Sequence, residues 1–421
     1  MTAQPAAAPA PRPAGTADRR TASWQRKRRQ LLDAAAEVFF RHGLDGGTTK
    51  KIAERAGLSQ SSVYHYFSSK EEILGEIARQ VYRDFTAALD QALSGPEQDP
   101  ARRLGQVVDA FVGSLVPNQH TFAVYWQQYR SIPADIAQEA RAAERAFVRR
   151  VEEVVAAAQR EGVLPAGHAT QILTEGILGM MSWTYWWYRP ARHTPQQVAA
   201  AFRDLIGLHP QAASSAPAPG GEAARIHDHE RRRRELIATA AEVFFRRGFD
   251  AGSTTEIAQR AGVSQSTIYH YFSSKEQLLE EIARQVYGDF TSALDRALAG
   301  ERTAGTQLGQ VIDIFLGSLV DNQRTFAVYW KENRSLPADV AREARERERA
   351  YVQRVEHIVA AAQREGVLPT GHATQILTEG ILGMMSWTHW WYRPARHTPQ
   401  QVAAAFRDLL RIGGTAGAGR D

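Results

Sequence analysis

The chain has 421 residues, a hydrophobic content of 43%, a formal net charge of +5 and no cysteine. This length exceeds one ordinary domain, and the lack of cysteine excludes disulfides, thiolate zinc sites and a cysteine nucleophile. The basic balance permits a polyanionic partner without proving one. Residues 1–18 lack the apolar core of a signal peptide, and no run of about 18 apolar residues predicts a membrane-spanning helix. We therefore expect a cytoplasmic protein with no membrane contact.

The chain begins with a polar, Ala/Pro-rich tail and then a series of helices. Residues 24–42 place apolar side chains on one helical face, and Gly43 ends that helix. Thr48 or Thr49 caps a short second helix, and Ser59 caps a third. The segments that follow have helical periodicity interrupted by prolines and no strand pattern. The expected fold class is all-α.

The two short helices, separated by Gly57 and preceded by a longer helix, form a helix-turn-helix pattern. A Gln and small hydroxyl residues at the start of the second short helix suit the major groove, where amide and hydroxyl groups pair with base edges. Residues 19–83 hold 13 Lys/Arg against 7 Asp/Glu, a local excess that favours phosphate contact. Core packing is the alternative role for Tyr64 and Phe67.

The chain contains two copies of one unit, and this repeat determines its domain organisation. Residues 59–67 read SQSSVYHYF, and residues 264–272 read SQSTIYHYF. The unit is longer than a solenoid repeat, so a whole subunit is duplicated. The expected boundaries are a disordered tail (1–18), a basic segment (19–83), a helical domain (84–206), a flexible linker (207–224), a second basic segment (225–288), a second helical domain (289–412) and a second disordered tail (413–421).

Residues 48–74 and 253–279 each resemble the signature of the TetR family, with the sequences TTKKIAERAGLSQSSVYHYFSSKEEIL and STTEIAQRAGVSQSTIYHYFSSKEQLL. The resemblance implies, in each copy, a helix-turn-helix DNA-binding domain followed by a ligand-binding and dimerisation domain. The implied base contacts are Gln60, Ser61 and Ser62, with Gln265, Ser266 and Thr267. The implied phosphate contacts are Thr49, Tyr64, Tyr66 and Lys70, with Thr254, Tyr269, Tyr271 and Lys275, and His65 and His270 complete the expected DNA-binding set.

The two basic segments differ in charge. Lys50 and Lys51 become Thr255 and Glu256, and residues 225–288 hold 10 Lys/Arg against 9 Asp/Glu. We therefore expect the second DNA-binding domain to contribute less phosphate attraction. Because the two recognition helices differ only by conservative changes, the expected partner is double-stranded DNA with an approximately palindromic operator.

Residues 161–206 and 365–410 are nearly identical, with three differences in 46 positions. In an isologous interface each change acts on both partners, which limits divergence. TetR-like subunits pair through their last two long helices, which are these segments. We therefore expect an intramolecular pseudo-dimer with a four-helix interface, in which Gly176 and Gly179 allow close approach. Recent gene conversion is the alternative, and two chains could also associate into a dimer of pseudo-dimers.

Aromatic residues in the helical domains are candidates for an effector pocket, since apolar walls with a few polar groups suit small ligands. The candidates are Phe111, Phe122, Trp126, Tyr129, Met180, Trp183 and Trp187, with Phe315, Phe326, Trp330, Asn333, Met384, Trp387 and Trp391 in the second copy. Core or interface packing is the alternative for each. Tyr129 against Asn333, and Tyr185 against His389, predict either two unlike pockets or one working pocket and one that is filled.

Residues 176–190, GILGMMSWTYWWYRP, resemble the C-terminal domains of TetR regulators that respond to acyl-CoA or steroid-derived thioesters. This resemblance implies a small hydrophobic or aromatic effector, with acyl-CoA as one candidate, whose phosphate or carboxylate would meet Arg189 or Arg192. The predicted function is a repressor released from its operator by that effector. The sequence does not distinguish repression from activation.

Two other classes of function are alternatives to a ligand-responsive regulator. An enzyme could use Glu175 with His168, or His193 with Arg192, as an acid–base pair, but no nucleophile, metal or phosphate-loop motif supports one. We therefore expect no catalysis, no cofactor and no metal. An architectural DNA binder without an effector would have a filled C-terminal core, and a cavity there would count against it.

Overall fold

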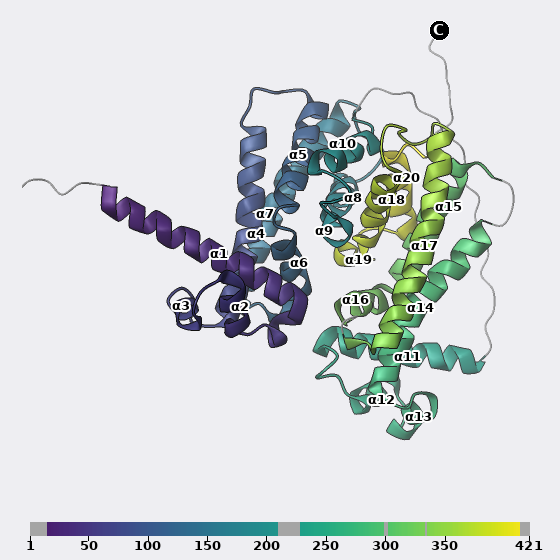
Figure 1. Cartoon of the computed structure of the whole chain (residues 1–421). Coiled ribbons are helices and arrows are strands. Elements are labelled where there is room, and N and C mark those ends of the chain that lie inside the picture. The colour runs from purple at the N-terminus through teal and green to yellow at the C-terminus, as the bar shows by residue number, and fades with distance from the viewer. Residues whose placement is uncertain (1–14, 209–227, 299–301, 333–334, 413–421) are drawn as a thin grey trace, which may run out of the picture. The chain divides into compact units, whose positions relative to one another are not determined.

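The computed structural model describes residues 15–208, 228–298, 302–332 and 335–412, and all regular structure in these ranges is helical (Figure 1). The all-α prediction is confirmed. No helix in the described ranges is long and apolar enough to cross a membrane. Most of the predicted linker and both chain ends lie outside the described residues, although the first helix already begins at Gly15, within the predicted tail.

The chain divides into two compact units, which do not coincide with the two sequence copies. The first unit contains residues 1–84 and 118–145, and the second contains residues 85–117 and 146–421. The break after Asp84 falls inside α4 (Lys70–Leu93). The second copy, by contrast, forms one unit together with most of the first copy's helical domain.

The first unit contains the first helix-turn-helix domain, which we call head 1. Head 1 consists of α1 (Gly15–Gly46), α2 (Thr49–Ala56), α3 (Gln60–Tyr64) and the start of α4 (Lys70–Leu93). The unit also contains α6 (Gln119–Gln127), a 3-10 turn (Tyr129–Ser131) and the start of α7 (Ala134–Arg160). In this unit α1 packs against α2 and α6, and α2 packs against α3 (Figure 1).

Local sequence explains the breaks between these helices. Gly43 has a φ of 69°, a conformation that glycine adopts without steric cost, and it interrupts α1. Thr48, rather than Thr49, caps α2 by accepting a hydrogen bond from the backbone N–H of Lys51. Gly57 ends α2 in the left-handed region, and the Ser59 side chain caps α3.

The second unit holds the rest of the first helical domain and the whole second copy. Its first-copy elements are the ends of α4 and α7 together with α5 (Pro100–Leu115), α8 (Thr170–Ser182), α9 (Thr184–Trp187) and α10 (Pro195–Leu205). Head 2 contains α11 (Asp228–Arg247), α12 (Thr254–Ala261), α13 (Gln265–Tyr271) and the start of α14 (Lys275–Ala297). The second helical domain continues with α15 (Ala304–Asp321), α16 (Gln323–Glu332), α17 (Ala338–Arg364), α18 (Thr374–Ser386), α19 (Thr388–Trp391) and α20 (Pro399–Leu409).

The two copies meet through α8, α10, α18 and α20 at the centre of this unit. Helix α8 packs along α18, α10 packs on α18, and α20 packs on α8 (Figure 1). A Cβ atom added at Gly176 would lie 2.7 Å from Phe406, and one added at Gly380 would lie 2.8 Å from Phe202. Only glycine permits this spacing, so the predicted intramolecular pseudo-dimer is present.

Candidate functional site

In head 1 the exposed end of the helix-turn-helix carries a connected polar network. The side-chain amide Nε2 of Gln60 donates to Thr49 Oγ1 at 3.2 Å, and that hydroxyl lies 3.2 Å from the Tyr64 hydroxyl. Ser59 Oγ lies 2.9 Å from Ser61 Oγ and 2.7 Å from Ser62 Oγ. The network joins α2 to α3 and orients the side chains predicted to contact DNA.

Exposure distinguishes the residues that can contact DNA from those that hold head 1 together. Tyr64 is 54% exposed, and Gln60 and His65 are also exposed, whereas Phe67 is 2% exposed. Phe67 is therefore a core residue, as the packing alternative predicted, whereas Tyr64 is not packed in the core. Lys70 Nζ donates to Leu44 O at 3.2 Å, so this predicted phosphate contact also ties the start of α4 to the end of α1.

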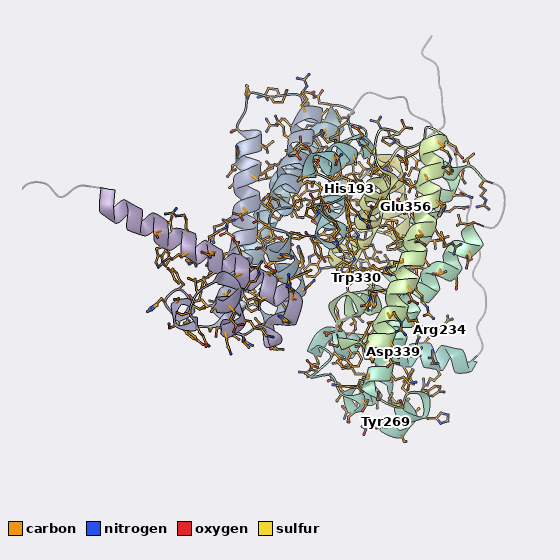
Figure 2. All side chains as sticks on the ribbon, viewed as in Figure 1. His193, Arg234, Tyr269, Trp330, Asp339 and Glu356 are labelled. Atoms are coloured by element: carbon orange, nitrogen blue, oxygen red, sulfur yellow. The ribbon has the colours of Figure 1, made fainter. Side chains whose placement is uncertain are left out.

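Head 2 repeats the same network with its own residues. Gln265 Nε2 donates to Thr254 Oγ1 at 3.0 Å, and that hydroxyl lies 3.3 Å from the Tyr269 hydroxyl. Ser266 and Thr267 each hydrogen-bond the capping Ser264. Lys275 donates to the backbone carbonyls of Phe249 and Asp250. Tyr269, at the outer end of head 2, is 51% exposed (Figure 2).

The recognition helices of the two heads end differently. Helix α3 ends at Tyr64, so His65 and Tyr66 lie just beyond it, whereas α13 continues to Tyr271.

The Tyr66 ring packs against Trp24 of α1, with 5.5 Å between ring centroids. Arg28 lies 5.9 Å from the Trp24 ring centroid. Trp24 was not among the predicted DNA-binding residues, although an aromatic residue among basic side chains beside the motif is a signal in the sequence.

The second-copy pocket candidates fall into three environments. Phe315 is a core residue stacked on Phe290, with 4.5 Å between ring centroids. Phe326 alone of the candidates lines a small void of about 10 Å³, roughly the space for one water molecule, between α14, α15 and α16. The other residues around this void are Gln285, Val286, Phe290, Ser318, Leu319, Asn322 and Thr325. Asn333 lies outside the described residues.

Several remaining candidates belong to the interface between copies. Trp330 of α16 contacts Trp183 and Trp186 of the first copy, with centroids 4.9 and 4.8 Å apart. Trp387 donates its indole N–H to Glu175 at 3.4 Å. The buried Met384 lies beside Gly176. For these residues the structure supports interface packing, which was the alternative to a ligand pocket.

The other first-copy candidates are divided between the two compact units. Phe122, Trp126 and Tyr129 belong to the first unit, where Trp126 and Tyr129 stack with centroids 6.4 Å apart. Phe111 belongs to the second unit and stacks on Phe85, with centroids 4.4 Å apart. Met180, Trp187 and, in the second copy, Trp391 are buried side chains of the second unit.

The acid–base pairs that an enzyme would need have other partners in the structure. His168 pairs with Asp408, Glu175 accepts from Trp387, and His193 Nε2 lies 3.4 Å from Gln375 Oε1. Among the described residues no cluster of His, Cys, Asp or Glu could hold a metal ion. These histidines and carboxylates therefore serve the interface between copies.

Two titratable groups of the second unit have strongly perturbed pKa values. Burial raises the pKa of Glu379 to about 7, although a hydrogen bond from Trp183 acts in the opposite direction. Burial lowers the pKa of His389 to about 4, because the charged imidazolium is disfavoured there. The first copy has Tyr185 at the position of His389.

Two family models match the chain, each of them twice. The model for bacterial regulatory proteins of the tetR family matches residues 31–77 and 236–282. The model for the tetracyclin repressor-like C-terminal domain matches residues 97–207 and 301–413. The matched pairs reproduce the duplication and place each helix-turn-helix segment before a helical domain.

Curated relatives and solved structures resemble single copies or parts of them. The HTH-type transcriptional regulator BetI of Burkholderia ambifaria is 36% identical over 105 residues, covering 24% of this chain and 54% of that protein. The chain thus spans about half the length of the curated relatives it matches. The regulator PfmR from Thermus thermophilus is 26% identical, covers 42% of this chain and 95% of its own, and has a TM-score of 0.39. The ketosteroid regulator KstR2 of Mycobacterium tuberculosis is 21% identical, covers 46% and 99%, and has a TM-score of 0.41.

Proposed function

This chain belongs to the TetR family of bacterial regulatory proteins and is a DNA-binding transcriptional regulator, and we propose that it acts as a cytoplasmic repressor in which one polypeptide supplies both heads. The observation that carries this proposal is the repeated network of Gln, Thr and Tyr at the exposed tip of each head. Helices α8 and α18 join the two copies, as a homodimer interface would.

The networks suit direct reading of bases in the major groove. One N–H of the Gln60 amide is held by Thr49, which leaves the amide oxygen and the second N–H available. That pair of groups matches the N6 and N7 edge of adenine. Gln265 is held in the same way by Thr254, so we propose an operator with two similar half-sites in palindromic arrangement.

The void beside Phe326 supports an effector that acts on head 2. Helix α14 begins in head 2 and forms one wall of the void, while α16 packs against both α11 and α14. A ligand that separates α14 from α16 would therefore move α11 and the head attached to it. Repression ends when the ligand favours a head position that no longer fits the half-site.

The lining suggests a mainly hydrophobic effector with one polar end. Phe290, Phe326 and Leu319 provide apolar walls, while Gln285 and Asn322 provide amides. The void has room for about one water molecule and is far smaller than the roughly 300 Å³ at which ligand pockets begin. The effector must therefore widen it, and for an acyl-CoA only the acyl end would enter.

The first experiment measures the solution mass of the chain together with its binding to a duplex selected from random DNA. We expect one chain of 46.7 kDa to bind one operator with two half-sites. If only a two-chain species bound, with four heads on the DNA, the one-chain repressor would be wrong.

The effector proposal is tested on the same complex with a series of short-chain acyl-CoA esters and with free coenzyme A as the control. We expect an ester to release the DNA from the wild-type chain. Ser318→Leu should block that release by filling the void, while DNA affinity without ligand stays unchanged. Equal release from this variant would place the effector elsewhere.

A further inference from the structure

The base-reading networks of the two heads give little basis for telling one half-site from the other. Gln60 and Gln265 are held by the same kind of hydroxyl at 3.2 and 3.0 Å, and Tyr64 and Tyr269 are exposed to similar extents. A difference between the heads must come from groups outside these networks. Such groups are found on α1 and α2.

Helix α2 of head 1 carries two exposed lysines that head 2 lacks. Lys50 and Lys51 form no ion pair with the described part of the chain, and Lys51 Nζ donates to Gly46 O at 3.0 Å. Both ammonium groups therefore remain available to phosphates. At the counterpart positions head 2 has Thr255 and Glu256, so it lacks this pair of charges.

Glu256 also neutralises positive charge around it. Its carboxylate lies 3.1 Å from Arg260 and 3.7 Å from Arg247. Arg55, the counterpart of Arg260, is likewise paired in head 1, with Glu37. The difference in positive charge between the heads therefore arises from Lys50, Lys51 and Glu256, because the corresponding arginines are paired in both heads.

Trp24 adds a second difference between the heads. The large hydrophobic side chains exposed in the described part of the chain are Trp24, Tyr64 and Tyr269, at 48, 54 and 51%. Two of these belong to the networks at the tips of the heads. The Trp24 ring packs on Tyr66, one of the predicted phosphate contacts of head 1, and position 229 of head 2 is His. An exposed indole there can cover the sugar–phosphate backbone with its face.

We infer that head 1 contacts more of the DNA backbone than head 2, so that the chain prefers one orientation on an operator whose two half-sites differ in backbone charge. The surface responsible consists of Trp24, Lys50 and Lys51. This inference rests on the proposed DNA binding. Two identical chains have no preferred orientation on any operator, and unequal heads have none on a perfectly symmetric one. The preference therefore requires the unequal heads of this fused pseudo-dimer together with unequal half-sites.

Orientation is measured with a perfect palindrome, derived from the selected operator, in which one half-site carries uncharged methylphosphonate linkages. Because the chain has no cysteine, Glu54→Cys and Gln259→Cys each provide one thiol for an iron–EDTA cleavage reagent. These positions correspond between the copies and are exposed on α2 and α12. We expect the Glu54→Cys conjugate to cut mainly the charged half-site and the Gln259→Cys conjugate mainly the neutralised one.

A charge exchange between heads provides the decisive variant. The variant carries Lys50→Thr, Lys51→Glu, Thr255→Lys and Glu256→Lys, which leaves the total charge of the chain unchanged. It should reverse the cutting pattern, and Trp24→His should weaken the wild-type preference. Raising the salt from 50 to 200 mM should reduce the preference about threefold for each phosphate contact by which the heads differ.

The outcomes separate the inference from the function on which it rests. Equal cutting of both half-sites by both wild-type conjugates would overturn the orientation while leaving DNA binding intact. An unchanged pattern after the charge exchange, with helical content preserved by circular dichroism, would overturn the role of the lysines. A chain that selects no duplex from random DNA would instead contradict the proposed function.

Discussion

His168 of the first copy and Asp408 of the second pair across the interface within the chain, with Nε2 and Oδ2 2.7 Å apart. The reciprocal pair, His372 with Asp204, has a separation of 2.6 Å. Two equivalent contacts related by the duplication are the signature of an isologous interface, here inside a single polypeptide. They fix the register of the α8/α10 pair against the α18/α20 pair at both ends.

A double-mutant cycle measures what this pairing contributes to stability. His168→Ala, Asp408→Ala and the double variant should give a coupling free energy of about 0.2–1 kcal/mol, because Asp408 is half exposed and water screens the pair. Urea unfolding supplies the free energies. The reciprocal cycle on His372 and Asp204 should give a similar value, and no coupling in either would show that the pairs do not stabilise the interface.

Close packing at the interface predicts opposite effects of one substitution at two glycines. Gly380→Ala places a Cβ 2.8 Å from Phe202, and overpacking of this kind costs about 1–3 kcal/mol. Gly113→Ala, on the exposed face of α5, meets no atom within 4 Å and should stabilise the chain by about 0.5–1 kcal/mol. Urea unfolding distinguishes the two, and equal effects would contradict the close approach of α8 and α18.

The buried carboxyl of Glu379 predicts a loss of stability as the pH rises. Its pKa is raised to about 7, chiefly by burial and also by Glu348 and Glu356, against the effects of Trp183 and Arg189. The folded state therefore holds a proton that the unfolded state releases near pH 4.5, and stability falls between these values by at most about 3 kcal/mol. Glu379→Gln should flatten this profile in urea unfolding from pH 4.5 to 8. A profile as steep as wild type would rule out Glu379 as its source.

The Gln networks predict where base specificity resides. Gln60→Ala should cost about 1–3 kcal/mol of DNA binding and relax the base preference in one half-site. Gln265→Ala should do the same in the other half-site. Selection of operators from random DNA by each variant shows which bases are freed. Glu54→Ala, an exposed change on α2, is the control, and relaxed preference in neither half-site would contradict the assignment.

Much of this arrangement could be predicted from the sequence, because it depends on local chemistry or on the repeat. The Ser59 cap, the break at Gly43 and the close approach at Gly176 follow from the residue type at each position. Helical periodicity shows that a residue is buried but does not identify its partner. The periodicity therefore left Trp183 and Trp330 as pocket candidates with interface packing as the alternative, and the structure shows that they meet each other across the interface.

His389 predicts a stability change in the opposite pH direction, with the first copy as the matched reference. Its pKa is lowered to about 4 by burial, so the folded state resists a proton that the unfolded state accepts near pH 6.5. Stability contributed by the neutral ring is present above pH 6.5 and is lost as the pH falls toward 4, by at most about 3 kcal/mol. The variant His389→Tyr installs the residue found at position 185 and should remove this loss, measured as the urea midpoint between pH 7 and 4. The reverse exchange, Tyr185→His, should introduce acid sensitivity in the first copy if its surroundings match those of His389. If His389→Tyr left the loss of stability between pH 7 and 4 unchanged, that loss would arise from another group.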